Sequence, residues 1–182
     1  MGCKIMLKKF RSAFSTFHHK ERYVTHEQEI ADKKFTIRQM STDDIKELLQ
    51  LERAVYAGEI PWTRSAFLAE LYSRYAHLYL CVLYQNKIIG FVGSRASLDD
   101  LHITHIAIHP DFQKNGIASF LLKEVEAFGF RQHCQTISLE VRISNIDAKR
   151  LYRKLGYEAK KRMANYYRIG NEDALYMVKR VK

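Results

Sequence analysis

Two hydrophobic periodicities alternate along residues 34–182, and this alternation constrains the fold more than any other feature of the chain. Short runs that alternate or are continuously apolar predict strands near residues 35–39, 78–83, 88–92, 102–108, 136–141, 157–167 and 174–180. Apolar residues at helical spacing predict helices near residues 45–55, 63–71, 116–130 and 145–155. The resulting order, β-α-α-β-β-β-α-β-α-β-β, indicates a single α/β sheet with helices on both faces.

Residues 1–34 depart from this pattern and predict a basic N-terminal extension, which leaves the main domain at residues 35–182. The whole chain carries a formal charge of +10, and five basic residues precede the first acidic one, Glu21. Phe10, Phe14 and Phe17 are spaced to share one helical face. The segment is therefore either a basic amphipathic helix that binds a surface or a partly ordered extension that is helical in part.

Composition narrows the class of protein. No apolar run reaches the ~18–20 residues that cross a bilayer, and the N-terminus lacks the apolar core of a secretory signal, so a cytoplasmic location is expected. The three cysteines form neither a disulfide framework nor a paired metal motif. The positive charge either favours an anionic partner, such as a phosphorylated cofactor, RNA or a membrane face, or serves solubility alone. No motif indicates a specific nucleic acid.

Three histidines near one predicted strand suggest a metal site at first sight. Strand alternation, however, places His102 on the face opposite His105 and His109. Ligands on two faces of a sheet cannot surround one ion, so the sequence predicts no metal.

The turn at residues 113–118 joins the predicted strand 102–108 to a helix and is the main sequence signal for a ligand. A helix N-terminus offers unpaired backbone N–H groups and the positive end of a dipole, which suit a phosphate group. Gly116 and the small Ala118 allow close approach of the backbone, and Lys114 adds a cation. Without further residues, an ordinary helix start explains the same pattern.

The segment from Ile106 to Ala118, IAIHPDFQKNGIA, resembles motif A of the GCN5-related N-acetyltransferases (GNAT). This resemblance implies the GNAT fold, a single mixed, mostly antiparallel and twisted sheet, and acetyl-CoA as cofactor, with coenzyme A as product. It implies that the strand offers its backbone to the pantetheine and the thioester, and that the turn binds the pyrophosphate. The residues concerned are Ile106, Ala107, Ile108, Gln113, Lys114, Asn115, Gly116, Ile117 and Ala118.

Acyl transfer to an amine needs a base for the amine proton and an acid for the leaving thiolate. Glu140, inside an apolar strand, and Tyr152, on the inner face of the following helix, are candidates for these roles. Alternatively, Glu140 forms an ion pair with Arg142 or Lys149, and Tyr152 is a core aromatic.

The stretch from Leu139 to Tyr157 resembles the closing motif of the ribosomal-protein-alanine N-acetyltransferases (RimI type). The resemblance implies that Glu140 is the general base, that Tyr152 is the general acid and also contacts the cofactor, and that Asn145 contacts the pantetheine.

Two further segments resemble the walls that enclose a peptide in protein N-terminal acetyltransferases. Tyr166 and Tyr167 begin one of them, and Trp62 belongs to the other. Together these resemblances imply direct transfer of acetyl, in a ternary complex, to the N-terminal α-amine of alanine on a small-subunit ribosomal protein. Two alternatives are left open: acetylation of a lysine or a small-molecule amine, and a non-catalytic acyl-CoA-binding module.

Overall fold

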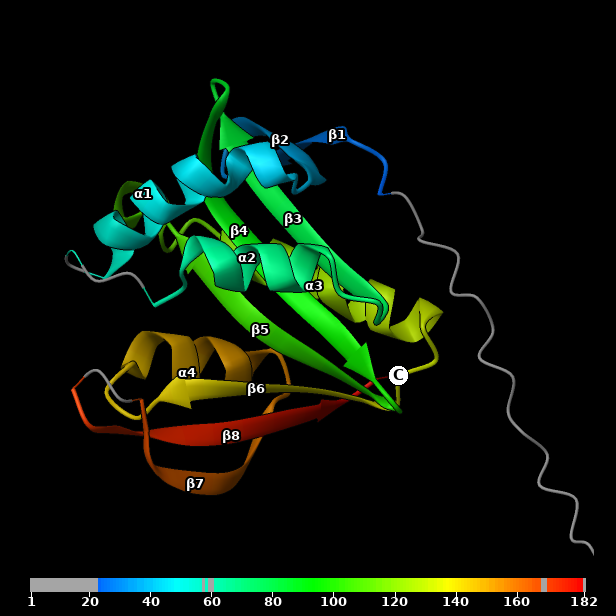
Figure 1. Cartoon of the computed structure of the whole chain (residues 1–182), viewed down its shortest axis with the longest axis vertical. Coiled ribbons are helices and arrows are strands. Elements are labelled where there is room, and N and C mark those ends of the chain that lie inside the picture. Colours follow the sequence, from blue (N-terminus) through cyan, green and yellow to red (C-terminus); the bar gives the residue numbers. More distant parts are fainter. Residues whose placement is uncertain (1–22, 57, 59–60, 168–169, 182) are drawn as a thin grey trace, which may run out of the picture.

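The computed structural model describes residues 23–56, 58, 61–167 and 170–181, and the predicted face of Phe10, Phe14 and Phe17 lies outside these ranges. In these ranges eight strands form one sheet in the order β1-β2-β3-β4-β5-β6-β8-β7 (Figure 1). The strands are β1 (His26–Ile30), β2 (Lys33–Gln39), β3 (His77–Tyr84), β4 (Lys87–Ser97), β5 (Asp100–Ile108), β6 (Thr136–Arg142), β7 (Glu158–Tyr167) and β8 (Glu172–Arg180). The α-helices are α1 (Ile45–Val55), α2 (Arg64–Leu71), α3 (Ile117–Arg131) and α4 (Ile146–Lys154).

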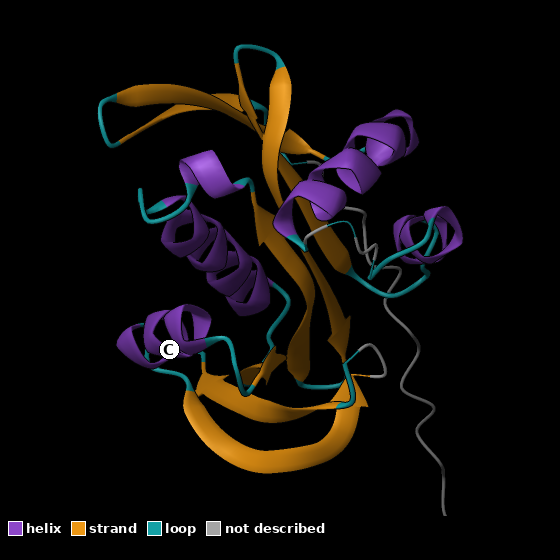
Figure 2. Cartoon of the chain, turned by 90° about the vertical axis from the view of Figure 1, so that its left-hand side faces the viewer, coloured by secondary structure: helices purple, strands orange, loops and turns teal. Residues whose placement is uncertain are grey.

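Helices cover both faces of this sheet, as Figure 2 shows edge-on. One apolar cluster joins the sheet to α3 and α4 through residues such as Leu121, Val125 and Tyr152. A second cluster joins the opposite face to α1 and α2 through residues such as Leu48 and Phe67. The predicted fold class, a mixed and mostly antiparallel sheet between helices, is therefore confirmed.

The contact between β5 and β6 is the parallel pair of the sheet, and it is short. Its register covers only Asp100, Leu101 and His102 on β5, opposite Thr136, Ile137 and Ser138 on β6. Figure 1 shows the two strands meeting at one end and separating toward the other. Beyond His102, the edge of β5 that faces β6 therefore has backbone groups available for a ligand.

The first strand, β1, was not among the predicted elements, and it changes the boundary of the N-terminal extension. It pairs with β2 over its whole length, from His26 opposite Ile37 to Ile30 opposite Lys33. Four of its five residues are polar, and its turn to β2 uses Ala31 and Asp32 with positive φ instead of the usual Asn-Gly. The sequence thus lacks both signals that identify a hairpin, although residues 26–30 belong to the sheet.

The prediction that His102 and His105 lie on opposite faces is wrong. The register of β4 with β5 shifts between Gly93, opposite His105, and Ser94, opposite Ile103, so Thr104 is an extra residue in β5. A β-bulge of this kind interrupts the alternation of side chains. As a result His102 and His105 both point toward the α1 and α2 side of the sheet.

Candidate active site

The turn that follows β5 has the conformation of a ligand-binding helix start. The Gln113 side chain donates a hydrogen bond to the carbonyl of Ile108 (2.9 Å), which ties the turn to the end of the strand. Gly116 has φ +88°, a left-handed conformation that a side chain would strain. The N–H of Phe120 donates a hydrogen bond to the carbonyl of Gly116 (3.0 Å), at the start of α3. The N–H groups of the first turn of α3 therefore have no partner within the helix.

A pocket of about 710 Å³, here called the turn pocket, lies between this turn, β5 and α4. Nearly all the residues expected to bind the cofactor line it, and Asn115 alone among them is outside its lining. Those that line it are Ile106, Ala107, Ile108, Gln113, Lys114, Gly116, Ile117, Ala118, Asn145 and Tyr152. The exposed Lys114 ammonium lies 3.2 Å from the carboxylate of Asp147 at the rim.

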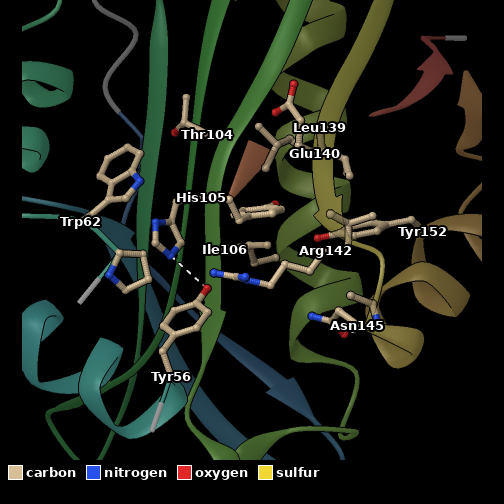
Figure 3. Close-up of a pocket in the computed structure, with 15 residues that line it drawn as sticks. Tyr56, Trp62, Thr104, His105, Ile106, Leu139, Glu140, Arg142, Asn145 and Tyr152 are labelled. Carbon is tan, nitrogen blue, oxygen red and sulfur yellow. Dashed lines mark hydrogen bonds between the residues drawn. The ribbon is translucent and has the colours of Figure 1, made fainter. Parts of the chain in front are cut away.

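A second pocket of about 170 Å³, here called the strand pocket, opens between β5 and β6 where the strands separate (Figure 3). Glu140, Trp62 and Tyr167 line it. The residues shared by the two pockets are Tyr56, Ile106, Arg142, Asn145, Ala148 and Tyr152. The turn pocket and the strand pocket therefore meet at Tyr152, within the opening between the strands.

Tyr152 is held at this junction by helix α4. The helix begins at Asn145, whose side-chain oxygen accepts a hydrogen bond from the N–H of Ala148 (3.0 Å). Tyr152 is only 6% exposed and packs edge-on against Tyr157, and in Figure 3 its ring points into the pocket. Burial raises the pKa of the Tyr152 phenol, so the hydroxyl keeps its proton at neutral pH and can act as a donor. Tyr152 is thus both a core aromatic and a pocket residue.

Glu140 projects from β6 toward a partner that the sequence did not predict. Its Oε2 lies 3.1 Å from Nε2 of His102, across the end of the parallel pair. The partners considered from the sequence have other contacts: Arg142 pairs with Glu172 (3.1 Å), and Lys149 donates to the carbonyl of Ile143. Residue spacing alone could not find His102, because its face depends on the bulge.

The three expected acceptor-binding aromatics are placed differently from one another. Trp62 and Tyr167 line the strand pocket, and the guanidinium of Arg142 lies 4.2 Å from the Tyr167 ring centroid. Tyr166 is 43% exposed and outside this lining. Burial, and after it the negative charge of Glu140, raise the pKa of the Tyr166 phenol.

A buried acid–imidazole cluster behind Trp62 is a further feature that the sequence did not predict. Glu52 of α1 is fully buried; its Oε1 lies 3.4 Å from Nε2 of His105, and its Oε2 accepts the N–H of Trp62 (3.2 Å). Tyr56 Oη is 3.2 Å from the same His105 nitrogen. Burial raises the pKa of Glu52 to about 7 and lowers that of His105 to about 4. The sequence does contain one signal for this cluster, because Glu52 is a carboxylate on the apolar face of the helix predicted near residues 45–55.

Within the described ranges, no group of three or more His, Cys, Asp or Glu side chains could hold a metal ion. No described helix has the length and apolar character needed to span a bilayer.

Comparison with known proteins decides the family. The sequence model of the acetyltransferase (GNAT) family matches residues 42–157, which is more than half of the chain. The chain belongs to the GNAT family. Its catalytic class is therefore that of an N-acetyltransferase.

Individual relatives fall within the same family. The chain is 34% identical over 148 residues to the ribosomal protein bS18-alanine N-acetyltransferase of Salmonella typhimurium, covering 78% of this chain and 95% of the relative. It is 27% identical over 158 residues to an N-alpha-acetyltransferase of Saccharolobus solfataricus, covering 80% and 92%. The crystal structure of the corresponding ribosomal-protein-alanine enzyme from Escherichia coli superposes with a TM-score of 0.72 at 29% identity, covering 81% and 94%.

Proposed function

We propose that this GNAT protein transfers acetyl from acetyl-CoA to the N-terminal α-amine of alanine on a small-subunit ribosomal protein. The observation that carries the proposal is the junction at Tyr152, where the turn pocket meets the smaller strand pocket. Direct transfer needs the thioester and the amine to meet at one point, with an acid and a base beside it. The names of the Salmonella and Escherichia coli relatives support alanine as the acceptor residue.

The turn pocket suits acetyl-CoA in shape and charge. The left-handed Gly116 and the free N–H groups at the start of α3 form a cradle for a pyrophosphate, and Lys114 adds a positive charge at the rim. The unpaired edge of β5 at Ile106 and Ile108 leads from this cradle to Tyr152 and fits an extended amide-bearing arm. Bound there, acetyl-CoA supplies the activated acetyl thioester.

The chain's own residues move the protons. Glu140 accepts a proton from the attacking amine, because an ammonium group has no lone pair with which to attack. Tyr152 holds its proton at Oη on the wall shared by the two pockets and donates it to the departing sulfur. Acetyl then passes directly to the amine in a ternary complex.

The strand pocket suits the first residue of a peptide with a small side chain. Its volume of about 170 Å³ is modest, and its walls are the aromatic rings of Trp62, Tyr56 and Tyr167. Such rings pack against a peptide backbone and a methyl group, and their hydroxyls bond to amides. Tyr166 lies outside the lining of this pocket, within the electrostatic influence of Glu140, and is proposed to contact the peptide beyond its first residue.

The test is acetyl transfer from labelled acetyl-CoA to synthetic peptides that begin with Ala, Ser or Met. Each peptide is paired with an N-terminally blocked copy that carries a free lysine. Faster transfer to the free Ala terminus is the expected result. Transfer to the blocked lysine peptides, or to polyamines alone, would replace the proposal with a lysine or small-amine activity. Coenzyme A binding by calorimetry with no transfer to any amine would indicate a non-catalytic acyl-CoA-binding module.

A further inference from the structure

A chain of close polar contacts crosses the short parallel pair of β5 and β6 and ends at Glu140. Asp100 begins β5, and its two carboxylate oxygens accept hydrogen bonds from the hydroxyls of Thr136 (2.6 Å) and Ser138 (2.5 Å) on β6. The Ser138 oxygen lies 2.9 Å from Nδ1 of His102, and Nε2 of His102 lies 3.1 Å from Glu140. The chain therefore runs Asp100–Ser138–His102–Glu140.

Counting hydrogens along this chain places a proton on Nδ1 of His102. An ionised carboxylate has no hydrogen, so Ser138 must donate its single hydroxyl hydrogen to Asp100. Its oxygen is then left as an acceptor toward Nδ1 of His102, and Nδ1 must carry the proton. In the neutral ring, Nε2 consequently has a lone pair that faces the Oε2 of Glu140.

We propose that Asp100 and Ser138 are positioning residues that hold His102 with its proton on Nδ1, so that Nε2 and Glu140 form one proton-accepting unit. Two lone pairs 3.1 Å apart repel each other, and a proton placed between them removes this repulsion. The proton that Glu140 takes from the amine is therefore stabilised between Oε2 and Nε2. Over one turnover Glu140 and His102 gain no net proton, because the proton taken from the amine later leaves them for solvent.

The geometry explains why the chain lies at this point of the sheet. Asp100, His102 and Ser138 all belong to the three-residue register of β5 with β6. Glu140 is two residues further along β6, where the strands have begun to separate and the strand pocket opens. The paired end of β5 and β6 thus orients a side chain that reaches into the strand pocket.

The experiment reads the tautomer of His102 directly. Long-range nitrogen–proton NMR correlations distinguish an imidazole protonated on Nδ1 from one protonated on Nε2, and His102→Gln assigns the signals by their loss. The expected wild-type state is the Nδ1–H form. Ser138→Ala removes the acceptor for Nδ1, and Asp100→Ala frees the serine hydrogen to bond to Nδ1. Both variants are expected to shift His102 toward the Nε2–H form.

Asp100→Asn is the matched control. Asparagine can accept the Ser138 hydroxyl with its carbonyl oxygen and donate its amide N–H to the hydroxyl oxygen of Thr136, so the Nδ1–H form should persist although the charge is lost. In acetyl transfer, Ser138→Ala and Asp100→Ala should lower kcat about 10- to 100-fold with the KM for acetyl-CoA unchanged. Asp100→Asn should retain more of the wild-type kcat than Asp100→Ala. If Asp100 had only a structural role, Asp100→Asn and Asp100→Ala would not differ in kcat and tautomer in this way.

Two results would overturn the inference: His102 protonated on Nε2 in the wild-type protein, or an unchanged tautomer and kcat in both alanine variants. The inference rests on the proposed function only for the kinetic part. The NMR readout needs no acetyl transfer, so a tautomer that responds as expected in a protein that acetylates no amine would refute the proposed function and leave the positioning intact. Normal transfer to Ala peptides with no tautomer change in the variants would support the proposed function and refute the positioning role of Asp100 and Ser138.

Discussion

At the scale of single residues, Glu140 should contribute to turnover and little to cofactor binding. Glu140→Gln keeps the size of a half-buried side chain on β6 but removes the proton acceptor. We expect kcat to fall about 100-fold with the affinity for acetyl-CoA nearly unchanged. Steady-state kinetics and calorimetry on the same sample measure the two effects. An equal loss of both would mean that Glu140 has a structural role.

Tyr152→Phe removes one hydroxyl from the junction of the two pockets without emptying the core. Because the phenol keeps its proton when buried, its loss should remove the acid for the departing sulfur. We expect a fall in kcat of about 10- to 100-fold, with thermal stability changed little because the ring still packs on Tyr157. Tyr157→Phe, on the same ring pair but outside both pockets, is the matched control and should retain its kcat.

Sequence reasoning identified Glu140 and Tyr152 from the chemistry that acyl transfer requires, and the structure places both on the wall of the strand pocket. It did not find His102 as the partner of Glu140, because one extra residue in β5, Thr104, reverses the face on which preceding side chains lie. It also did not single out Glu52, a carboxylate on the apolar face of α1. Contacts across the sheet depend on register and bulges, and a single sequence does not encode them visibly.

At the scale of elements, helix α1 contains a fully buried carboxylate that should make the stability of the fold depend on pH. Burial raises the pKa of Glu52 from its ordinary 4.5 to about 7 in the folded state. Below pH ~4.5 the group is protonated in both states and carries no penalty. Stability is lost as the pH rises from 4.5 to about 7, because the unfolded state releases a proton that the folded state retains, and above pH 7 the folded state holds a buried charge.

Glu52→Gln should therefore raise the free energy of unfolding at pH 8 by about 2–4 kcal/mol and at pH 5 by much less. Urea unfolding of variant and wild type at both pH values measures the difference. His105 opposes this trend in both proteins, because its lowered pKa removes stability as the pH falls from 6.5 toward 4. An equal gain at both pH values would show that the effect of Gln is packing and not charge.

The start of helix α3 should be sensitive to any side chain at Gly116. Its φ of +88° is a conformation that residues with a Cβ rarely adopt, so Gly116→Ala strains the turn by about 1 kcal/mol. The N–H groups of the cradle should then be misaligned. We expect the KM for acetyl-CoA to rise severalfold with a smaller change in kcat. Lys123→Ala, on an exposed position of the same helix, should leave both values unchanged.

At the scale of the whole molecule, the order of the elements followed from periodicity, but the N-terminal limit of the fold did not. Strand β1 is polar, and its place in the sheet depends on backbone pairing with β2 and on contacts such as Tyr23 Oη to Glu124 (2.9 Å). Neither leaves a pattern in the sequence. Periodicity reports which residues face a core, and an edge strand has little core to face.

Two truncations test this limit. Deletion of residues 1–22 should preserve both the melting temperature and transfer to short peptides. Deletion of residues 1–32 removes β1, its turn and the hydrogen bond from Tyr23 to Glu124, and it should lower the melting temperature by several degrees. Differential scanning calorimetry compares the two. Equal melting temperatures would mean that β1 adds nothing to the stability of the sheet.

Because β5 and β6 separate, the sheet is open at this point and its two faces are connected. The turn pocket opens on the side of α3 and α4, whereas Trp62 and Tyr56 approach the strand pocket from the side of α1. Two reactants can therefore arrive from opposite directions and leave without displacing one another. If the proposed function holds, an acceptor attached to a large particle would stay on the side of Trp62 while coenzyme A is exchanged from the side of α3 and α4.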